Sequence, residues 1–163
     1  MMRLTSSHFG FFVIFAAVYA AGTLALGRLP IGDVQVKPGE IAVPLVALFG
    51  TASLVGIVFG MFIANMASPL GPLDLLTPPI AFVGLILLRF LAKRSIFLGV
   101  AIYYVVTSAW TGFLTSLVTG QGNAFFTAFI SQGIAIAAGT VIYFIAQSRM
   151  PKPVASHAAE AQA

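Results

Sequence analysis

Residues 95–148 read SIFLGVAIYYVVTSAWTGFLTSLVTGQGNAFFTAFISQGIAIAAGTVIYFIAQS, and no Asp, Glu, Lys or Arg interrupts them. As one helix this stretch would be about 80 Å long, whereas the hydrocarbon core of a bilayer is about 30 Å thick. The chain must therefore fold back on itself. Glycine alternates with polar residues at positions 120–123, Gly-Gln-Gly-Asn, which favours a turn there. The stretch thus predicts two membrane-spanning helices, at about residues 96–118 and 124–146.

The composition of the whole chain is that of a membrane protein. Its 163 residues are 60% hydrophobic and only 7% charged, well below the charged share of a soluble domain. So few charged side chains could not cover a protein surface in water, whereas a surface in lipid needs none. We therefore expect an all-α, multi-pass protein of the cell membrane.

Other apolar stretches extend this helical pattern toward the N-terminus. Residues 9–26 are nearly all apolar and predict a retained first helix. Further along, Thr77 is expected to cap a helix that begins at Pro78 and runs to about residue 91. Together with the two helices above, these make four predicted spans.

The segment 41–67 is long for one crossing and short for two. Pro44 weakens its early part, and the small residues at 50–53, Gly-Thr-Ala-Ser, favour a turn between two short helices. A split predicts a six-helix transmembrane domain over residues 1–148. The polar, proline-containing residues 149–163 predict a disordered cytoplasmic tail.

The basic residues lie at the ends of the apolar runs, which is typical of topology determinants and not of a nucleic-acid-binding face. Six crossings with both termini in the cytoplasm place six of the eight basic residues inside. Five crossings with the N-terminus outside place seven inside, so the charges alone do not choose. The eight residues are Arg3, Arg28, Lys37, Arg89, Lys93, Arg94, Arg149 and Lys152.

The residues needed for most enzyme chemistry are missing from the sequence. There is no cysteine, and the only histidines, His8 and His157, lie near opposite ends of the chain. This argues against a metal site, a cofactor and a catalytic triad. No phosphate-binding glycine loop is present, and residues 95–148 lack an acidic group for proton coupling. The chain is not expected to be an enzyme, and any transport would draw its energy from a partner.

Three carboxylates fall on the external side of the six-helix arrangement: Asp33, Glu40 and Asp74. Carboxylates beside an apolar bundle are costly unless they are paired or bind something, so they predict a ligand site between loops and helix ends. The alternative is that Asp33 and Glu40 pair with Arg28 and Lys37 in a solvated loop. That alternative is favoured for Asp33, and it stays open for Glu40.

Two stripes of small residues indicate close helix packing, either within the bundle or with another subunit. The first helix carries overlapping pairs at Ala16, Ala17, Ala20 and Ala21. A glycine stripe at Gly56, Gly60 and Ala64 is expected to pack within the bundle.

Aromatic residues of the later helices either line a pocket or lie at the membrane interfaces. They are Tyr103, Tyr104, Trp110 and Tyr143. Trp110 falls in mid-span, so its indole N–H needs a buried partner.

The stretch from Val34 to Leu76 resembles the QueT family of queuosine-precursor transporters. The family pattern has an external Q-x-[KR]-x-x-E segment, a glycine-spaced helix that ends in A-N, and a G-x-x-D loop. The matching residues here are Gln35, Lys37, Glu40, Gly56, Gly60, Ala64, Asn65, Gly71 and Asp74.

This resemblance implies a substrate-binding S component of an energy-coupling factor (ECF) transporter, with six helices and an external site. It implies a 7-deazaguanine ligand whose N–H donors meet Glu40 or Asp74, while Gln35, Lys37 or Asn65 donates to the ligand carbonyl. An aromatic residue such as Trp110 would stack on the ring. The resemblance also implies partners, namely an ECF coupling subunit on the alanine face of the first helix, formed by Ala16 and Ala20 or by Ala17 and Ala21, and separate ATPase subunits.

The sequence departs from the family pattern beside Glu40. Family members commonly have arginine at the position of Lys37, and lysine lacks the bidentate donors of arginine. Pro38 and Gly39 replace a β-branched residue and a serine. An S component for another small heterocycle or vitamin is therefore an alternative, and so is a membrane scaffold subunit without a transport role.

Overall fold

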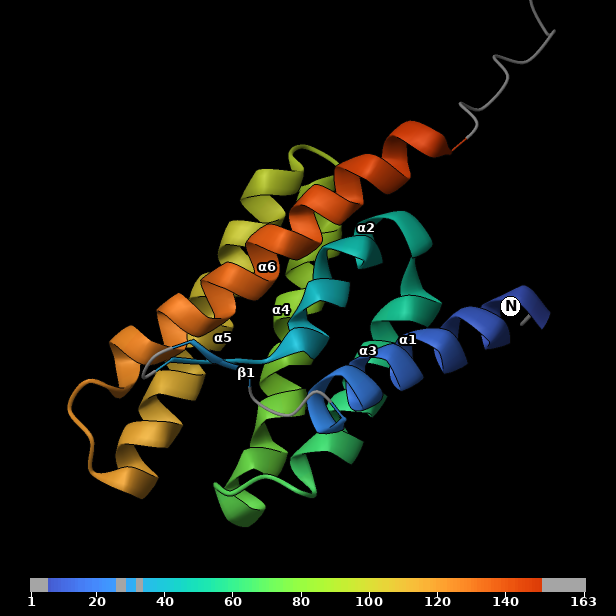
Figure 1. Ribbon diagram of the computed structural model, residues 1–163. Helices are drawn as coiled ribbons and strands as arrows, with labels where there is room; N and C mark the ends of the chain where they lie inside the picture. The colour runs from blue at the N-terminus through green and yellow to red at the C-terminus, as the bar shows by residue number, and fades with distance from the viewer. Residues whose placement is uncertain (1–5, 26–28, 32–33, 151–163) are drawn as a thin grey trace, which may run out of the picture.

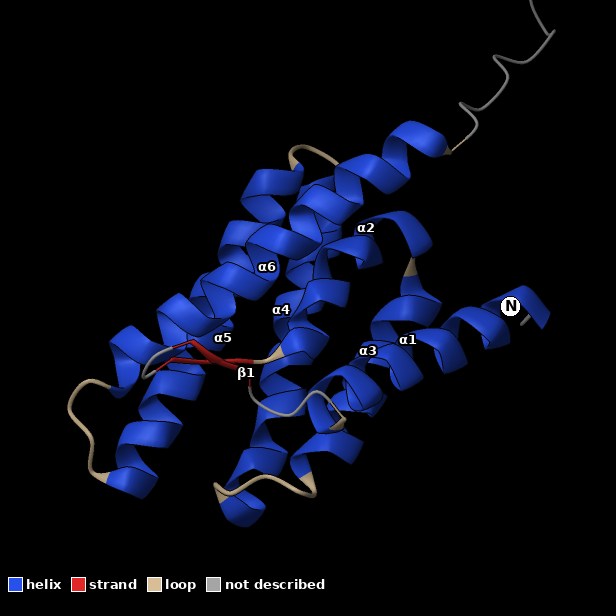
Figure 2. Ribbon diagram, in the orientation of Figure 1, coloured by secondary structure: helices blue, strands red, loops and turns tan. Residues whose placement is uncertain are grey.

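The computed structural model describes residues 6–25, 29–31 and 34–150, and these residues form a helical bundle with one short hairpin (Figures 1 and 2). Asp33, Arg28 and most of the predicted tail, residues 151–163, lie outside the described residues. The helices, 3-10 helices (η) and strands are, in order, α1 (Ser6–Leu24), β1 (Leu29–Ile31), β2 (Val34–Val36), η1 (Pro38–Leu45), α2 (Val46–Phe49), α3 (Thr51–Asn65), η2 (Gly71–Leu76), α4 (Thr77–Ala92), α5 (Ile96–Thr119) and α6 (Ala124–Arg149).

Four helical stretches in the described part of the chain are long and apolar enough to cross a membrane. They are Ser6–Leu24, Gly71–Ala92, Ile96–Thr119 and Ala124–Arg149. The remaining two, Pro38–Phe49 and Thr51–Asn65, are shorter apolar helices. With a rise of about 2.0 Å per residue in the 3-10 part and about 1.5 Å in the α-helical parts, each reaches only about 22 Å, less than the thickness of a bilayer core. The structure thus has the expected six helical segments, of which four have the length of a full crossing.

The predicted breaks in the helices are confirmed at two glycines. Gly50 separates α2 from α3 with φ 83° and ψ −156°, and Gly120 ends α5 with φ 68°. Both are left-handed backbone conformations that cost a residue with a Cβ more than glycine. The segment 41–67 therefore does fold as two short helices, joined at the first of its small residues.

The prediction that Thr77 caps the helix is wrong. Leu76 occupies the N-cap position in a helical conformation, and Thr77 is the first residue of α4. The reason is that η2 runs directly into α4, so no extended capping residue stands between them. The Thr77 hydroxyl is used elsewhere, as described below.

The hairpin was not expected in an all-α chain. β1 and β2 pair in an antiparallel register, with Pro30 opposite Gln35, between α1 and η1. Short strands of this kind contribute few backbone hydrogen bonds, so the fold remains that of a helical bundle.

Successive helical segments run alternately between two ends of the bundle (Figure 1). We call one of them the hairpin end; it holds β1, β2, η2 and the loop 120–123. The basic end holds the start of α1, the turn at Gly50, the turn at 93–95 and the end of α6. Four of the basic residues that the structure describes lie at or near the basic end, namely Arg89, Lys93, Arg94 and Arg149.

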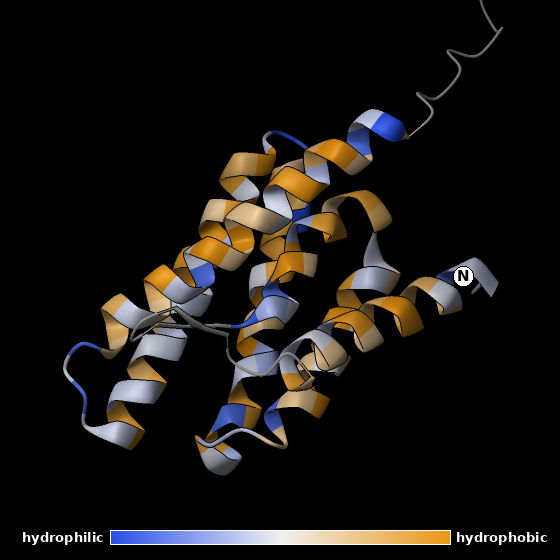
Figure 3. Cartoon of the chain, viewed as in Figure 1, coloured by the Kyte–Doolittle hydropathy of each residue, from blue (hydrophilic) through white to orange (hydrophobic). Residues whose placement is uncertain are grey.

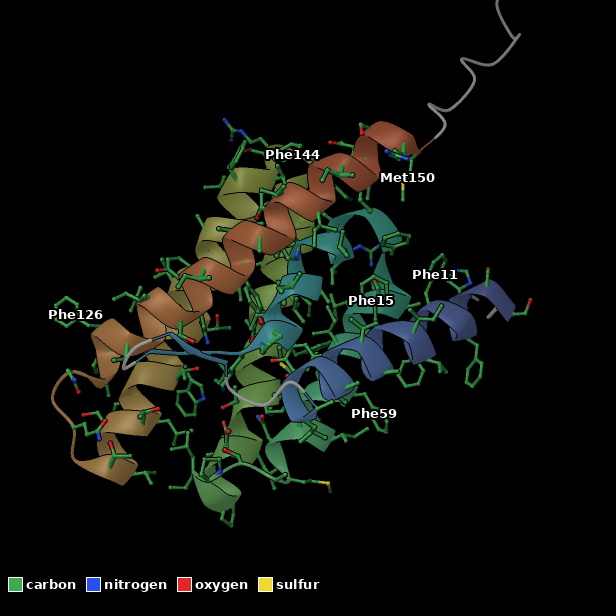
Figure 4. The ribbon with its side chains drawn as sticks, in the orientation of Figure 1. Phe11, Phe15, Phe59, Phe126, Phe144 and Met150 are labelled. Carbon is green, nitrogen blue, oxygen red and sulfur yellow. The ribbon has the colours of Figure 1, made fainter. Side chains whose placement is uncertain are left out.

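The glycine stripe of α3 packs inside the bundle, as predicted. A Cβ on Gly60 would lie 2.6 Å from the backbone oxygen of Ala16, and one on Gly56 would collide with that of Phe12. Only glycine allows α1 and α3 to approach this closely. Figure 4 shows Phe15 at this junction, where it is buried.

The outer surface of the bundle is apolar. Many large hydrophobic side chains of the helices are exposed, and hydrophilic residues gather at the loop 120–123 and at the end of α6 (Figure 3). Phe126 is 76% exposed and Phe90 is 70% exposed. Such a surface is stable in lipid and would drive aggregation in water.

Candidate functional site

Glu40 lies in the first turn of η1, at the hairpin end, and is buried with 3% of its surface exposed. The Tyr19 hydroxyl donates to its Oε1 at 2.8 Å, and the Tyr103 hydroxyl donates to its Oε2 at 3.0 Å. The carboxylate therefore joins three elements, α1, η1 and α5. Two hydrogen bonds to an ionised acceptor offset much of the cost of its burial.

Proline and glycine place Glu40 at this position. Pro38 starts η1, where its missing N–H is not needed, and Pro44 prevents regular α-helical hydrogen bonding further along. Gly39 lies directly on α1, because a Cβ there would be 2.8 Å from the Tyr19 backbone oxygen and would also meet the Thr23 hydroxyl. That hydroxyl oxygen is buried and has no hydrogen-bond partner among the described residues.

Asp74 is the second buried carboxylate, in η2, with 2% of its surface exposed. The Thr77 hydroxyl donates to its Oδ1 at 2.7 Å, and the Trp110 indole N–H donates to the Thr77 hydroxyl at 3.0 Å. The buried partner that Trp110 needs in mid-span is therefore Thr77. The Asn65 amide donates at 2.9 Å to the backbone oxygen of Asp74, which fixes η2 against the end of α3.

The two carboxylates are both close enough to Tyr19 to interact with its hydroxyl. Glu40 is hydrogen-bonded to the Tyr19 hydroxyl, and Asp74 is near enough to that hydroxyl to interact with it electrostatically. Lys37, which is half-buried just before η1, interacts in the same way with Glu40. The arrangement is a set of buried acceptors with aromatic rings beside them, within an apolar bundle.

A comparison with protein-family models decides the family. The model described as QueT transporter matches residues 12–148, most of the chain. The chain belongs to the QueT transporter family. No curated protein and no solved structure matches it.

Membership of the QueT family makes this chain a multi-pass membrane transport protein, in agreement with its apolar surface. The match includes both buried carboxylates and all of their hydrogen-bonding partners. Among the described residues no group of three His, Cys, Asp or Glu side chains could hold a metal ion.

The remaining residues that were expected to bind the ligand are placed as follows. Gln35 lies in β2, opposite Pro30, close along the chain to Lys37 and Glu40. Asn65 is buried, and its amide N–H is directed at the backbone of Asp74. This hydrogen bond fixes the backbone of η2 at Asp74.

The structure separates the four alanines of α1 into two faces. Ala16 and Ala20 are buried, and Ala16 packs on the glycine stripe of α3. Ala17 and Ala21 are exposed. Of the two alternatives for a partner-binding face in this QueT-family chain, only Ala17 and Ala21 lie on the surface.

Sequence reasoning missed several polar groups near this site. Tyr19 looked like one aromatic residue of an apolar span, and nothing local marks it as the partner of a residue 21 positions later. Gln132 was also missed: its Oε1 accepts hydrogen bonds from Thr107 at 3.0 Å and from Ser108 at 2.7 Å, and its Nε2 donates to Thr111 at 3.1 Å. A glutamine inside an apolar helix was a signal that could have been used.

Proposed function

We propose that this chain is the membrane-embedded substrate-binding subunit for uptake of a queuosine precursor of the 7-deazaguanine type. Separate ATPase subunits would energise uptake, through a coupling subunit. The observation that carries the proposal is the pair of buried carboxylates, Glu40 and Asp74, which both interact with the Tyr19 hydroxyl. A membrane protein retains such costly groups where they have a function.

The hydrogen bonding leaves both carboxylates able to accept more. Each oxygen of Glu40 takes one tyrosine hydroxyl and has a second lone pair. Within the described residues, Thr77 bonds to Oδ1 of Asp74, so Oδ2 can accept an N–H from a ligand. A 7-deazaguanine presents adjacent N–H donors on one edge, and a carboxylate matches them with two parallel hydrogen bonds.

The indole of Trp110 is suited to hold a flat ring. It is half-buried, and its N–H is fixed by the Thr77 hydroxyl, which in turn bonds to Asp74. A heterocycle hydrogen-bonded to Asp74 would therefore lie beside an aromatic face whose orientation is already set. Stacking of this kind adds about 0.5–1.5 kcal/mol beyond burial of the ring.

The proposed topology has six helical crossings with both termini in the cytoplasm. The basic end carries Arg89, Lys93, Arg94 and Arg149, and an excess of Lys and Arg favours the cytoplasmic side. The end of the bundle that carries the hairpin and η2 then faces the outside of the cell membrane. Lys37 is the one basic residue of the described part of the chain that lies at the hairpin end.

Thermal unfolding of the purified full-length protein tests the substrate. A ligand at 100 times its dissociation constant adds about 2.7 kcal/mol to the stability. We expect stabilisation by a 7-deazaguanine and weaker or no stabilisation by guanine or by vitamins. Glu40→Gln and Asp74→Asn should each weaken binding about tenfold or more, since ligand donors lose their acceptor.

Arg94→Gln is the matched control, since it neutralises one exposed charge at the opposite end and should leave the affinity unchanged. If both carboxylate variants bind the ligand as tightly as the parent protein does, the proposed site is wrong. If only a vitamin stabilises the protein, its substrate is another small heterocycle or vitamin and not a deazaguanine. The lysine at position 37, where family members commonly have arginine, is the sequence feature that motivates this alternative. No stabilisation by any compound would favour the scaffold alternative.

The coupling surface is tested with a second pair of variants. Ala17→Leu places a bulky side chain on the exposed face of α1, and Ala137→Leu does the same on α6. In cells that carry the partner subunits, Ala17→Leu should abolish uptake while the purified variant still binds ligand. Uptake that is equally reduced in both variants would contradict this assignment.

A further inference from the structure

A cavity at the basic end has no role in the proposed site. Its volume is about 240 Å³, and its walls come from α2, α4 and α6, including Ala47, Gly50, Arg89, Ala92, Lys93 and Tyr143. This is smaller than the pockets that hold drug-sized ligands, and it suits a group of a few heavy atoms. Neither Glu40 nor Asp74 lines it; they belong to the first turn of η1 and to η2.

Two cations face this cavity from the same side of α4. Arg89 and Lys93 are four residues apart, which places them on neighbouring turns of one helix face. The Arg89 guanidinium donates to the Thr51 hydroxyl and lies close to Gly50, so the turn between α2 and α3 holds it in place. A guanidinium has five N–H donors, and this one keeps donors for another acceptor.

The protein supplies no anion to these cations within its described residues. The carboxylates that the structure places are Glu40 and Asp74, and both are engaged at the hairpin end. Like charges four residues apart on a helix repel each other. An anion in the cavity would remove this repulsion and would accept hydrogen bonds from both side chains.

The surroundings of the cavity suit a lipid headgroup. The cavity lies at the last turn of a spanning helix, and Phe90 is 70% exposed next to Arg89. On the neighbouring surface, Phe97 and Phe144 pack together with their ring centroids 5.6 Å apart, both exposed. Figure 4 shows Phe144 projecting from this part of α6. Acyl chains can cover these aromatic side chains while the headgroup enters the cavity.

We propose that this cavity binds the phosphate of an anionic phospholipid, held by Arg89 and Lys93 beside Tyr143. The chemistry it recognises is a phosphate oxyanion, which free phosphate shares. This inference stands apart from the substrate site at the hairpin end. The bound lipid would belong to the membrane leaflet that surrounds the basic end.

The test uses the full-length protein, purified in an uncharged detergent and titrated with phosphatidylglycerol, phosphatidylcholine or inorganic phosphate. Bound lipid is counted by native mass spectrometry, and the unfolding temperature is followed in parallel. We expect phosphatidylglycerol to bind at least tenfold more tightly than phosphatidylcholine and to raise the unfolding temperature. Inorganic phosphate alone producing the same rise would support the oxyanion site and identify free phosphate as its occupant.

Charge-matched variants separate this cavity from general surface attraction. Arg89→Gln with Lys93→Gln removes the two cations of the cavity, and Arg94→Gln with Arg149→Gln removes two exposed cations that do not line it. We expect the first pair to weaken phosphatidylglycerol binding about tenfold or more and the second to change it less than threefold, since each nearby cation typically contributes about a fivefold effect. Equal weakening in both pairs would overturn the proposal.

Two single substitutions keep the test decisive if the first pair does not fold. Lys93→Gln alters an exposed side chain, and Ala92→Leu fills the cavity without changing a charge. Both should weaken phosphatidylglycerol binding while the protein remains monodisperse. Undiminished binding to Ala92→Leu would overturn the proposal, because attraction to surface charge alone does not need the cavity.

Discussion

The two ends of this bundle differ in whether their charged side chains are buried or exposed. At the hairpin end, Glu40 and Asp74 are buried, and hydroxyl groups of the protein satisfy them. At the basic end, Lys93 and Arg94 are exposed, and Arg89 has the Thr51 hydroxyl as its partner. Burial makes the carboxylates expensive to disturb, whereas exposed cations contribute little to stability. The comparison therefore predicts large effects of substitutions at one end and small effects at the other.

The largest effect is expected at Gly39. Gly39→Val forces a side chain against the Tyr19 backbone and should destabilise the fold by about 3 kcal/mol, through overpacking. Equilibrium unfolding in mixed micelles measures the change. Gly10→Ala is the control on α1, because a Cβ there meets nothing within 4 Å and alanine favours a helix. A neutral Gly39→Val would show that η1 is not packed directly on α1.

A smaller loss is expected when Glu40 loses one donor. Tyr103→Phe removes the hydroxyl that bonds to Oε2 and should cost about 2 kcal/mol, since a buried carboxylate loses a hydrogen bond. The same unfolding measurement applies. Tyr104→Phe is the matched control; its hydroxyl donates at 2.9 Å to the backbone oxygen of Phe129, a neutral acceptor. Its loss should be about 1 kcal/mol. If Tyr103→Phe and Tyr104→Phe lose the same amount of stability, the hydrogen bond to Glu40 contributes no more than one to a neutral backbone oxygen.

Breaking the hydrogen bonds that join Trp110 to Asp74 through Thr77 should cost less stability still. Trp110→Phe keeps an aromatic ring and deletes the N–H that bonds to Thr77, at a cost of about 1 kcal/mol. The proposed ligand should bind more weakly as well, because the ring is no longer held in place. Calorimetric titration and unfolding, performed together, check both effects. Unchanged affinity would remove Trp110 from the site.

The smallest effect is expected at the basic end. Arg94→Gln alters an exposed side chain and should change the stability by less than about 0.5 kcal/mol, with no dependence on salt beyond that of the parent. Unfolding at low and high ionic strength measures this. A loss comparable to that of Tyr103→Phe would contradict the contrast between the two ends.

Most of the fold could be predicted from the sequence, because hydropathy and breaks in the backbone are local properties. The uncharged run 95–148 and its glycine turn predicted α5 and α6 correctly, and the small residues from Gly50 predicted the break between α2 and α3. The glycine stripe at Gly56 and Gly60 was correctly assigned to packing within the bundle. In each case the deciding residues lie within one segment.

The site was predicted only in part, because its hydrogen bonds join distant segments. Glu40 and Asp74 stood out as rare carboxylates in an apolar chain, and the structure buries both. Their partners could not be read from the sequence, since Tyr103 lies 63 residues from Glu40 along the chain. Thr77 was misassigned because a threonine before two prolines is typical of a helix cap, whereas η2 continues directly into α4.

The short helices on either side of Gly50 have a consequence for the surrounding lipid. The hydrocarbon core of an ordinary bilayer is thicker than the length of Thr51–Asn65, whose Val55, Phe59 and Phe62 are exposed, so acyl chains beside α3 must shorten or tilt. Such hydrophobic mismatch costs a fraction of a kcal/mol for each ångström. The lipid shell around the protein should therefore be thinner beside α3 than beside α6.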